Sequence, residues 1–126
     1  MVVSGLYTGI GGFELGFQQS GHRTILMSEV DPDARKVIQH RFGEVALNTD
    51  IVKLRALPEE TEIVTAGFPC QDLSMAGKKQ GLDGEKSQVV DAMFRLLEAR
   101  RVPWVVVENV YFMLHLAQGA AMEYLS

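Results

Sequence analysis

The stretch that decides the fold is Val2-Val3-Ser4-Gly5-Leu6-Tyr7-Thr8-Gly9-Ile10-Gly11-Gly12, near the start of a chain of 126 residues. Its mostly apolar first half predicts a strand over residues 2–7, and the glycines that follow predict a tight turn. A helical pattern comes next over residues 13–20, and Gly21 suits the C-terminal cap of that helix. A strand, a glycine turn and a helix in this order are typical of an α/β sheet.

The same alternation continues along the chain. Asp31 and Pro32 predict a helix start, with an N-cap followed by proline at the first helical position, and Gly43 marks its end. Ser87 is predicted to cap a later helix, and we expect Trp104 in the core. Further strands are predicted at residues 24–27, 45–47, 63–67 and 104–107, a glycine- and lysine-rich loop at 72–86, and a last helix at 114–125.

This pattern predicts an α/β fold with a mostly parallel, Rossmann-like sheet of about five strands and flanking helices. At 47% hydrophobic and 22% charged residues, residues 1–126 are expected to form a single globular domain. The apolar stretch 102–107 is too short to span a bilayer, and the N-terminus lacks the basic start of a signal peptide. We therefore expect an intracellular protein without a membrane partner, in the cytoplasm or nucleoid of a bacterium or the nucleus of a eukaryote.

The net charge and the number of cysteines exclude some classes of function. The net charge of −4 argues against a domain that carries its own nucleic-acid surface, so any DNA contact would be local or supplied by another part. Cys70 is the only cysteine, which excludes an internal disulfide and a zinc site built from several thiolates. A buried, inert thiol and a reactive one both remain open. The position of Cys70 after an apolar strand, within Gly67-Phe68-Pro69-Cys70-Gln71, favours a nucleophile.

Each predicted strand ends in a residue that can do chemistry. Open α/β sheets bind ligands at the carboxyl ends of their strands, so these ends are expected to form one site. An acidic residue at a strand end can also be a helix cap or a solvated loop residue, and for a single residue that reading stays open. In strand order the ends carry the glycine turn, Glu29, Asp50, Pro69-Cys70 and Glu108-Asn109.

The glycine turn and Glu29 together predict a nucleoside ligand. An acid about 20 residues after the first glycine can accept hydrogen bonds from ribose hydroxyls. However, Glu14 stands where the dinucleotide fingerprint has its third glycine, and a carboxylate there would compete with a pyrophosphate for the positive end of the helix dipole. S-adenosylmethionine fits better, with its ribose at Glu29, its adenine amino group at Asp50 and its amino-acid end at the turn.

These residues resemble the DNA cytosine-5 methyltransferases in order along the whole chain. Residues 6–13, Leu-Tyr-Thr-Gly-Ile-Gly-Gly-Phe, are similar to the first cofactor motif of that family. Residues 29–34 are similar to the second cofactor motif and Asp50-Ile51 to the third. Residues 67–74, Gly-Phe-Pro-Cys-Gln-Asp-Leu-Ser, resemble the catalytic motif, and Glu108-Asn109-Val110 resembles the motif that recognises the target base.

The resemblance implies transfer of a methyl group from S-adenosylmethionine to C5 of a flipped cytosine through a covalent adduct between Cys70 and C6. S-adenosylhomocysteine would be the product, and no metal is required. Glu108 would act as the general acid at N3 of the base. Base-binding or supporting roles fall to Pro69, Gln71, Ser74 and Asn109. The residues implied in cofactor binding are Tyr7, Thr8, Gly9, Ile10, Gly11, Gly12, Glu29, Val30, Asp50, Ile51, Pro69 and Val89.

Other parts of the family pattern do not occur in the sequence. These are the Gln-x-Arg-x-Arg motif, the target-recognition region and the C-terminal helix that completes the cofactor pocket. The chain is therefore expected to be the cofactor-binding and nucleophile half of a catalytic domain, inactive alone, that acts on double-stranded DNA with the missing half. A complementing chain or self-association is expected. The alternative is a non-catalytic module that binds S-adenosylmethionine or another protein.

Overall fold

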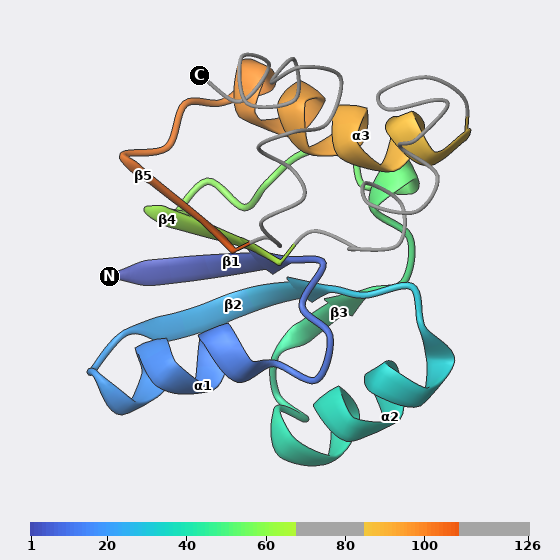
Figure 1. Ribbon diagram of the computed structural model, residues 1–126. Helices are drawn as coiled ribbons and strands as arrows, with labels where there is room; N and C mark the ends of the chain where they lie inside the picture. Colours follow the sequence, from blue (N-terminus) through green and yellow to red (C-terminus); the bar gives the residue numbers. More distant parts are fainter. Residues whose placement is uncertain (68–84, 109–126) are drawn as a thin grey trace.

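The computed structural model describes residues 1–67 and 85–108. Its strands form one sheet in the order β3-β2-β1-β4-β5, and all paired strands are parallel (Figure 1). The strands are β1 (Val2–Leu6), β2 (Arg23–Ser28), β3 (Ala46–Asn48), β4 (Ile63–Gly67) and β5 (Trp104–Glu108). The helices are α1 (Gly12–Gln19), α2 (Pro32–Arg41), α3 (Glu85–Ala99) and the 3-10 helix η1 (Ile51–Lys53).

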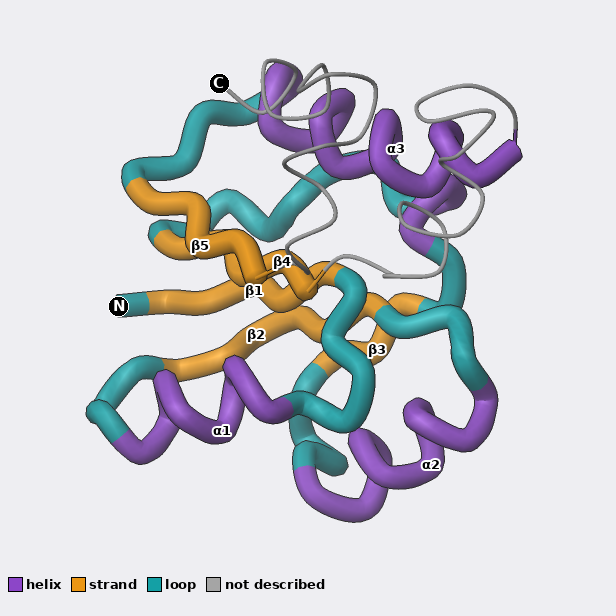
Figure 2. The backbone as a smooth tube through the Cα atoms, viewed as in Figure 1, coloured by secondary structure: helices purple, strands orange, loops and turns teal. Residues whose placement is uncertain are grey.

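Helices cover both faces of the sheet. Figure 2 shows α1 and α2 on one face and α3 on the other. On the α3 face, Leu6, Val64 and Ala66 pack with Met93 and Leu96 in the larger core cluster. On the opposite face, Met27 of β2 packs with Ile38 and Phe42. The predicted Rossmann-like α/β fold is confirmed, and every strand pair in the described sheet is parallel.

The glycine turn between β1 and α1 needs glycine for two reasons at Gly11. Its φ is +89°, a left-handed value that L-residues rarely adopt. A Cβ on Gly11 would also lie only 2.7 Å from Cε2 of Phe42 and 3.0 Å from Cε of Met27. The turn is thus packed directly against α2 and β2. At the other end of α1, Gly21 has a φ of +90°, as expected for the residue after a helix.

The start of α2 is confirmed in detail. The side chain of Asp31 accepts a hydrogen bond of 3.0 Å from the Asp33 backbone N–H, and Pro32 is the first helical residue. The helix η1 was not predicted, because three residues are too few to show a helical period. Asp50 caps η1 by accepting a hydrogen bond of 3.0 Å from the Val52 N–H.

Two expectations need correction. The helix expected after Ser87 begins at Glu85, an ordinary difference for a helix end. Trp104 was expected in the core, but 59% of it is exposed. It lies on β5, which has only β4 as a neighbour among the described strands, so β5 is less covered than the inner strands. The loop expected at 72–86 falls mostly, and the helix at 114–125 wholly, outside the described residues.

None of the described helices is both long enough and apolar enough to cross a membrane. Within residues 1–67 and 85–108, no three His, Cys, Asp or Glu side chains come together as they would around a metal ion.

Candidate active site

The carboxyl ends of the strands meet at one edge of the sheet because all the described strands run the same way. Residues at or next to the carboxyl ends of neighbouring strands are paired: Leu6 with Ser28 and with Ala66, and Gly67 with Glu108. The glycine turn follows β1 at this edge. The backbone therefore brings together the strand ends at which the sequence predicted a site.

Hydrogen bonds connect the glycine turn and Tyr7, which precedes it, to β2 and to α3. The Thr8 N–H donates to the carbonyl of Ser28 at 3.2 Å, which links the turn to β2. The hydroxyl of Tyr7 donates to the carbonyl of Val89, which links it to α3. Tyr7 itself has a φ of 52°, in the left-handed region that costs an L-residue about 1 kcal/mol or more. Such strain persists only where the surroundings enforce it, and it is common at binding sites.

Glu29 lies beside the glycine turn at the end of β2. One carboxylate oxygen accepts a hydrogen bond of 2.7 Å from the Gly9 N–H, and the other accepts one of 2.8 Å from the Asp31 N–H. Arg35 supports the same connection by donating to the carbonyl of Val30 at 2.6 Å. Because each carboxylate oxygen has two lone pairs, both oxygens of Glu29 can still accept a hydrogen bond from a ligand hydroxyl.

A first pocket, here called the Val30 pocket, opens beside these residues with a volume of about 310 Å³. Val30, which is 68% exposed, and Ile51, which is buried, both line it, so the pocket combines apolar surface with the carboxylates of Glu29 and Asp50. Its lining comprises Tyr7, Gly9, Ser28, Glu29, Val30, Asp50, Ile51, Gly67 and Val89. Most of the residues predicted to bind a cofactor are thus brought around one pocket.

A second hollow, here called the Glu108 hollow, adjoins the first and has a volume of about 380 Å³. Tyr7, Gly9 and Gly67 line both spaces. Thr8, Phe13 and Glu108 complete the Glu108 hollow. The glycine turn therefore stands between a pocket with two carboxylates and a hollow with one.

Three predicted cofactor residues do not line either space. Ile10 is exposed, Gly11 is buried beneath the turn, and Gly12 begins α1. Pro69, Cys70, Gln71, Ser74 and Asn109 lie outside the described residues, and the roles proposed for them remain predictions. The described chain leads up to them, because β4 ends at Gly67 and β5 at Glu108.

Glu14 is a residue of this region that the sequence analysis did not assign to the site. It was expected to affect a ligand at the helix N-terminus, but its side chain is buried, with 1% exposed. Desolvation raises the pKa of its carboxyl to about 7. Its Oε2 has no hydrogen-bond partner among the described residues. A glycine in the middle of a strand, Gly5, was the available sign that another side chain fills that space.

The charge of the two spaces is distinctive. Their described lining includes three carboxylates, from Glu29, Asp50 and Glu108, and no lysine, arginine or histidine. Such a lining attracts cations and repels anions such as a pyrophosphate. This charge pattern agrees with the expectation that the site does not bind the pyrophosphate of a dinucleotide.

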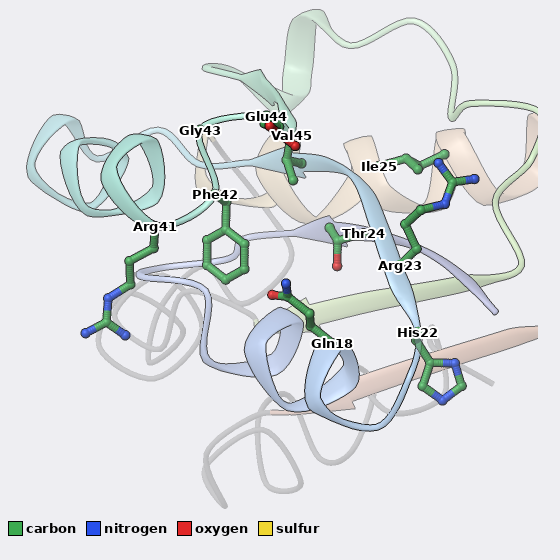
Figure 3. A pocket seen from close by; sticks show the side chains of 10 residues that line it. All are labelled: Gln18, His22, Arg23, Thr24, Ile25, Arg41, Phe42, Gly43, Glu44 and Val45. Atoms are coloured by element: carbon green, nitrogen blue, oxygen red, sulfur yellow. The ribbon is translucent and has the colours of Figure 1, made fainter.

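A larger cavity of about 490 Å³ lies at the opposite end of β2 (Figure 3). Thr24 and Gln18 are directed toward its interior, whereas the side chains of Arg41 and His22 point away from it (Figure 3). The Thr24 Oγ1 is buried and has no partner in the described part of the chain. None of the predicted site residues within 1–67 and 85–108 lines this cavity, although it is larger than the spaces at the carboxyl edge.

The family model for C-5 cytosine-specific DNA methylase matches residues 1–125. The chain belongs to this family. It is 49% identical to the type II methyltransferase M2.BsuMI of Bacillus subtilis over 130 residues, which is 100% of this chain and 33% of that protein. It is 30% identical to M.AquIA of Picosynechococcus over 128 residues, which is 94% of this chain and 52% of that protein.

A solved structure supports the fold of this family member. The crystal structure of the S. pombe Dnmt2 methyltransferase superposes with a TM-score of 0.75 at 19% sequence identity, covering 99% of this chain and 39% of that protein. The match to the family model over residues 1–125 confirms the resemblance to DNA cytosine-5 methyltransferases. The chain spans about a third of the length of M2.BsuMI.

Proposed function

We propose that residues 1–126 form the cofactor-binding and nucleophile half of the catalytic domain of a DNA cytosine-5 methyltransferase. One observation carries the proposal: the Val30 pocket and the Glu108 hollow share the glycine turn as a common wall. A cofactor in the first space and a base in the second would be neighbours across Tyr7, Gly9 and Gly67. Group transfer needs this kind of proximity.

The lining of the Val30 pocket fits S-adenosylmethionine. Glu29 can accept hydrogen bonds from the ribose hydroxyls, and Val30 and Ile51 offer apolar contact for adenine. The carboxylates and the absence of basic side chains among its described lining residues suit a positively charged ligand. When bound, S-adenosylmethionine supplies a methyl group on a positively charged sulfur.

The residues of the chain would act on the base. The thiolate of Cys70 forms a bond to C6 of cytosine, which moves electron density toward C5 and N3. Glu108 holds a proton at N3 and so stabilises this electron density. After C5 has been methylated, loss of the C5 proton and cleavage of the bond between sulfur and C6 restore the aromatic ring and the thiolate. Pro69, Gln71, Ser74 and Asn109 would position the base and the catalytic segment.

Double-stranded DNA is the proposed substrate, inside the cell, with the target cytosine flipped out of the stack. The net charge of −4 indicates that the DNA contacts come largely from outside residues 1–126, and a complementing chain or a second copy is one proposed source. β5 supports such an association. Trp104, Val105 and Val107 are exposed on it, and β4 is its only neighbour in the described sheet.

This exposed apolar strand also favours the alternative function, a non-catalytic module that binds S-adenosylmethionine or a protein partner. The two functions differ in what a completing half would do. If the chain is part of an enzyme, adding that half restores methyl transfer to DNA, and Cys70→Ser abolishes it. A serine variant with full turnover would contradict the proposed chemistry. Transfer of labelled methyl groups by the purified chain alone would show that no second half is needed.

Binding of S-adenosylmethionine to the purified chain, measured by isothermal titration calorimetry, tests the proposed pocket. We expect Glu29→Ala to weaken binding by about tenfold to a hundredfold, because hydrogen bonds to a charged group are lost. Glu44→Ala is the matched control, since Glu44 is exposed and lines only the cavity at the opposite end of β2. Thermal unfolding of both variants checks that they remain folded. Equal affinities for the two variants would contradict the assignment.

A further inference from the structure

Glu14 fills a space that belongs to β1. It lies in the first turn of α1, and its carboxyl rests over Gly5 in the middle of the strand. A Cβ on Gly5 would lie 2.9 Å from both Cδ and Oε1 of Glu14, and 2.8 Å from Cγ2 of Thr8. The carboxyl therefore occupies the space where a side chain at residue 5 would lie, close to Thr8 in the glycine turn.

Burying a carboxyl group over Gly5 costs free energy of folding. Glu14 is 1% exposed, and its Oε2 has no hydrogen-bond partner within residues 1–67 and 85–108. A methionine or leucine would fill the same volume without the cost of burying an unpaired polar atom. Buried titratable groups whose pKa values are shifted are concentrated at binding and catalytic sites. Because Glu14 is shielded from solvent, it would act through its electric field and not by direct contact.

Glu14 lies close to the glycine turn that forms the common wall of the two spaces. Its neighbour Thr8 precedes Gly9, which lines both the Val30 pocket and the Glu108 hollow. The other carboxyl groups at this edge, from Glu29, Asp50 and Glu108, face the two spaces. A charge on the buried Glu14 would be screened less by salt and water than a charge at the open rim. No basic side chain of the described lining opposes it.

We propose that Glu14 is a buried counter-charge that favours the positively charged cofactor over its neutral product. This inference rests on the proposed function, because it requires the Val30 pocket to bind S-adenosylmethionine. The cofactor is a sulfonium cation, whereas S-adenosylhomocysteine is a neutral thioether of otherwise similar shape. A negative charge beneath the glycine turn attracts the first and not the second. Glu14 thereby determines the preference of the site between substrate and product.

The test is the ratio of two dissociation constants. Calorimetry measures the binding of S-adenosylmethionine, of S-adenosylhomocysteine and of an analogue with an ammonium group in place of the sulfonium, to wild type and to Glu14→Gln. At pH 8 the variant is expected to bind both cations more weakly, by on the order of tenfold, and the thioether with little change. Glu44→Gln is the control, because it removes an exposed carboxyl at the far end of the sheet.

The outcomes separate the two proposals. Equal weakening of all three ligands, or no change in the ratio, would overturn the role of Glu14 while leaving the cofactor site intact. If wild type bound none of the three ligands, the proposed function would fail and this inference with it. Should Glu14→Gln not fold, calorimetry of wild type in two buffers of different ionisation enthalpy at pH 7 decides. Proton release on binding the cation but not the thioether supports the role, and equal release with both overturns it.

Discussion

The two ends of β2 differ in chemistry more than in shape. At its amino end, a cavity of about 490 Å³ has Phe42 and Thr24 in its lining and none of the predicted site residues that the structure describes. At its carboxyl end, two smaller spaces share the glycine turn and have three carboxylates around them. In a parallel sheet, the residues that follow the strands all meet at the same carboxyl edge, where ligands bind in open α/β sheets. The comparison favours the proposed site at the carboxyl edge because the predicted residues converge there, whereas cavity size alone would favour the amino end.

Gly11→Ala is expected to have the largest effect. Gly11 belongs to the glycine turn at the carboxyl end and packs against Phe42, which lines the cavity at the amino end of β2. The alanine would have to adopt a φ of +89° and place its Cβ 2.7 Å from Cε2 of Phe42, a residue that lines the amino-end cavity. We expect a loss of about 3 kcal/mol in the free energy of unfolding, measured with urea. Gly12→Ala is the control, since a Cβ there meets nothing within 4 Å. Equal stability of the two variants would contradict this packing of the turn.

Glu14→Gln is expected to change how stability depends on pH. Burial raises the pKa of Glu14 from 4.5 to about 7 in the folded chain, so ionisation of this carboxyl opposes folding. The stability of wild type relative to the variant is therefore highest below pH 4.5, falls as the pH rises toward 7, and stays low above it. The difference between pH 4 and pH 8 is expected to be about 3 kcal/mol. Urea unfolding of both proteins at several pH values measures it, and a difference that does not vary with pH would contradict the burial of this carboxyl.

Tyr7→Phe is expected to have a smaller effect at the carboxyl end. It removes the hydroxyl that donates to the carbonyl of Val89 and keeps the ring. The net loss of one such hydrogen bond is about 1 kcal/mol in unfolding free energy. Because Tyr7 and Val89 both line the Val30 pocket, affinity for S-adenosylhomocysteine should fall severalfold as well. Ser20→Ala serves as the control, as its hydroxyl bonds within α1 at 3.1 Å, away from the pocket. Unchanged affinity in Tyr7→Phe would show that the hydrogen bond from Tyr7 to α3 does not contribute to cofactor binding.

Thr24→Val is expected to have the smallest effect and the opposite sign. The buried Thr24 Oγ1 lacks a partner in the described structure, so its replacement by a methyl group should raise the free energy of unfolding by up to about 1 kcal/mol. Cofactor affinity should not change, because Thr24 lies at the amino end of β2. A marked change in cofactor affinity would show that the two ends of the sheet are coupled, and would remove the distinction between them.

Much of the site could be predicted from sequence because its residues are local to strand ends. Glu29 follows β2 directly, and Asp50 and Glu108 stand at comparable places, so an α/β pattern alone brings them to one edge. The position of Glu14 could not be predicted in this way. Its burial depends on the missing side chain of Gly5, which is nine residues away and on another element. The prediction that Trp104 lies in the core was wrong for a similar reason, since its exposure depends on what lies beside β5 and not on its own hydrophobicity.

The order of strands, turns and helices, the family and the residues at each strand end can all be read from the amino-acid sequence. These features rest on local patterns, namely hydrophobic period, glycine turns and helix caps, and on motifs that are contiguous in the chain. The strand order β3-β2-β1-β4-β5, the shared wall between the two spaces and the burial that raises the pKa of Glu14 are decided by the tertiary structure. They depend on which distant residues come into contact, and desolvation by those contacts changes the charge a side chain carries.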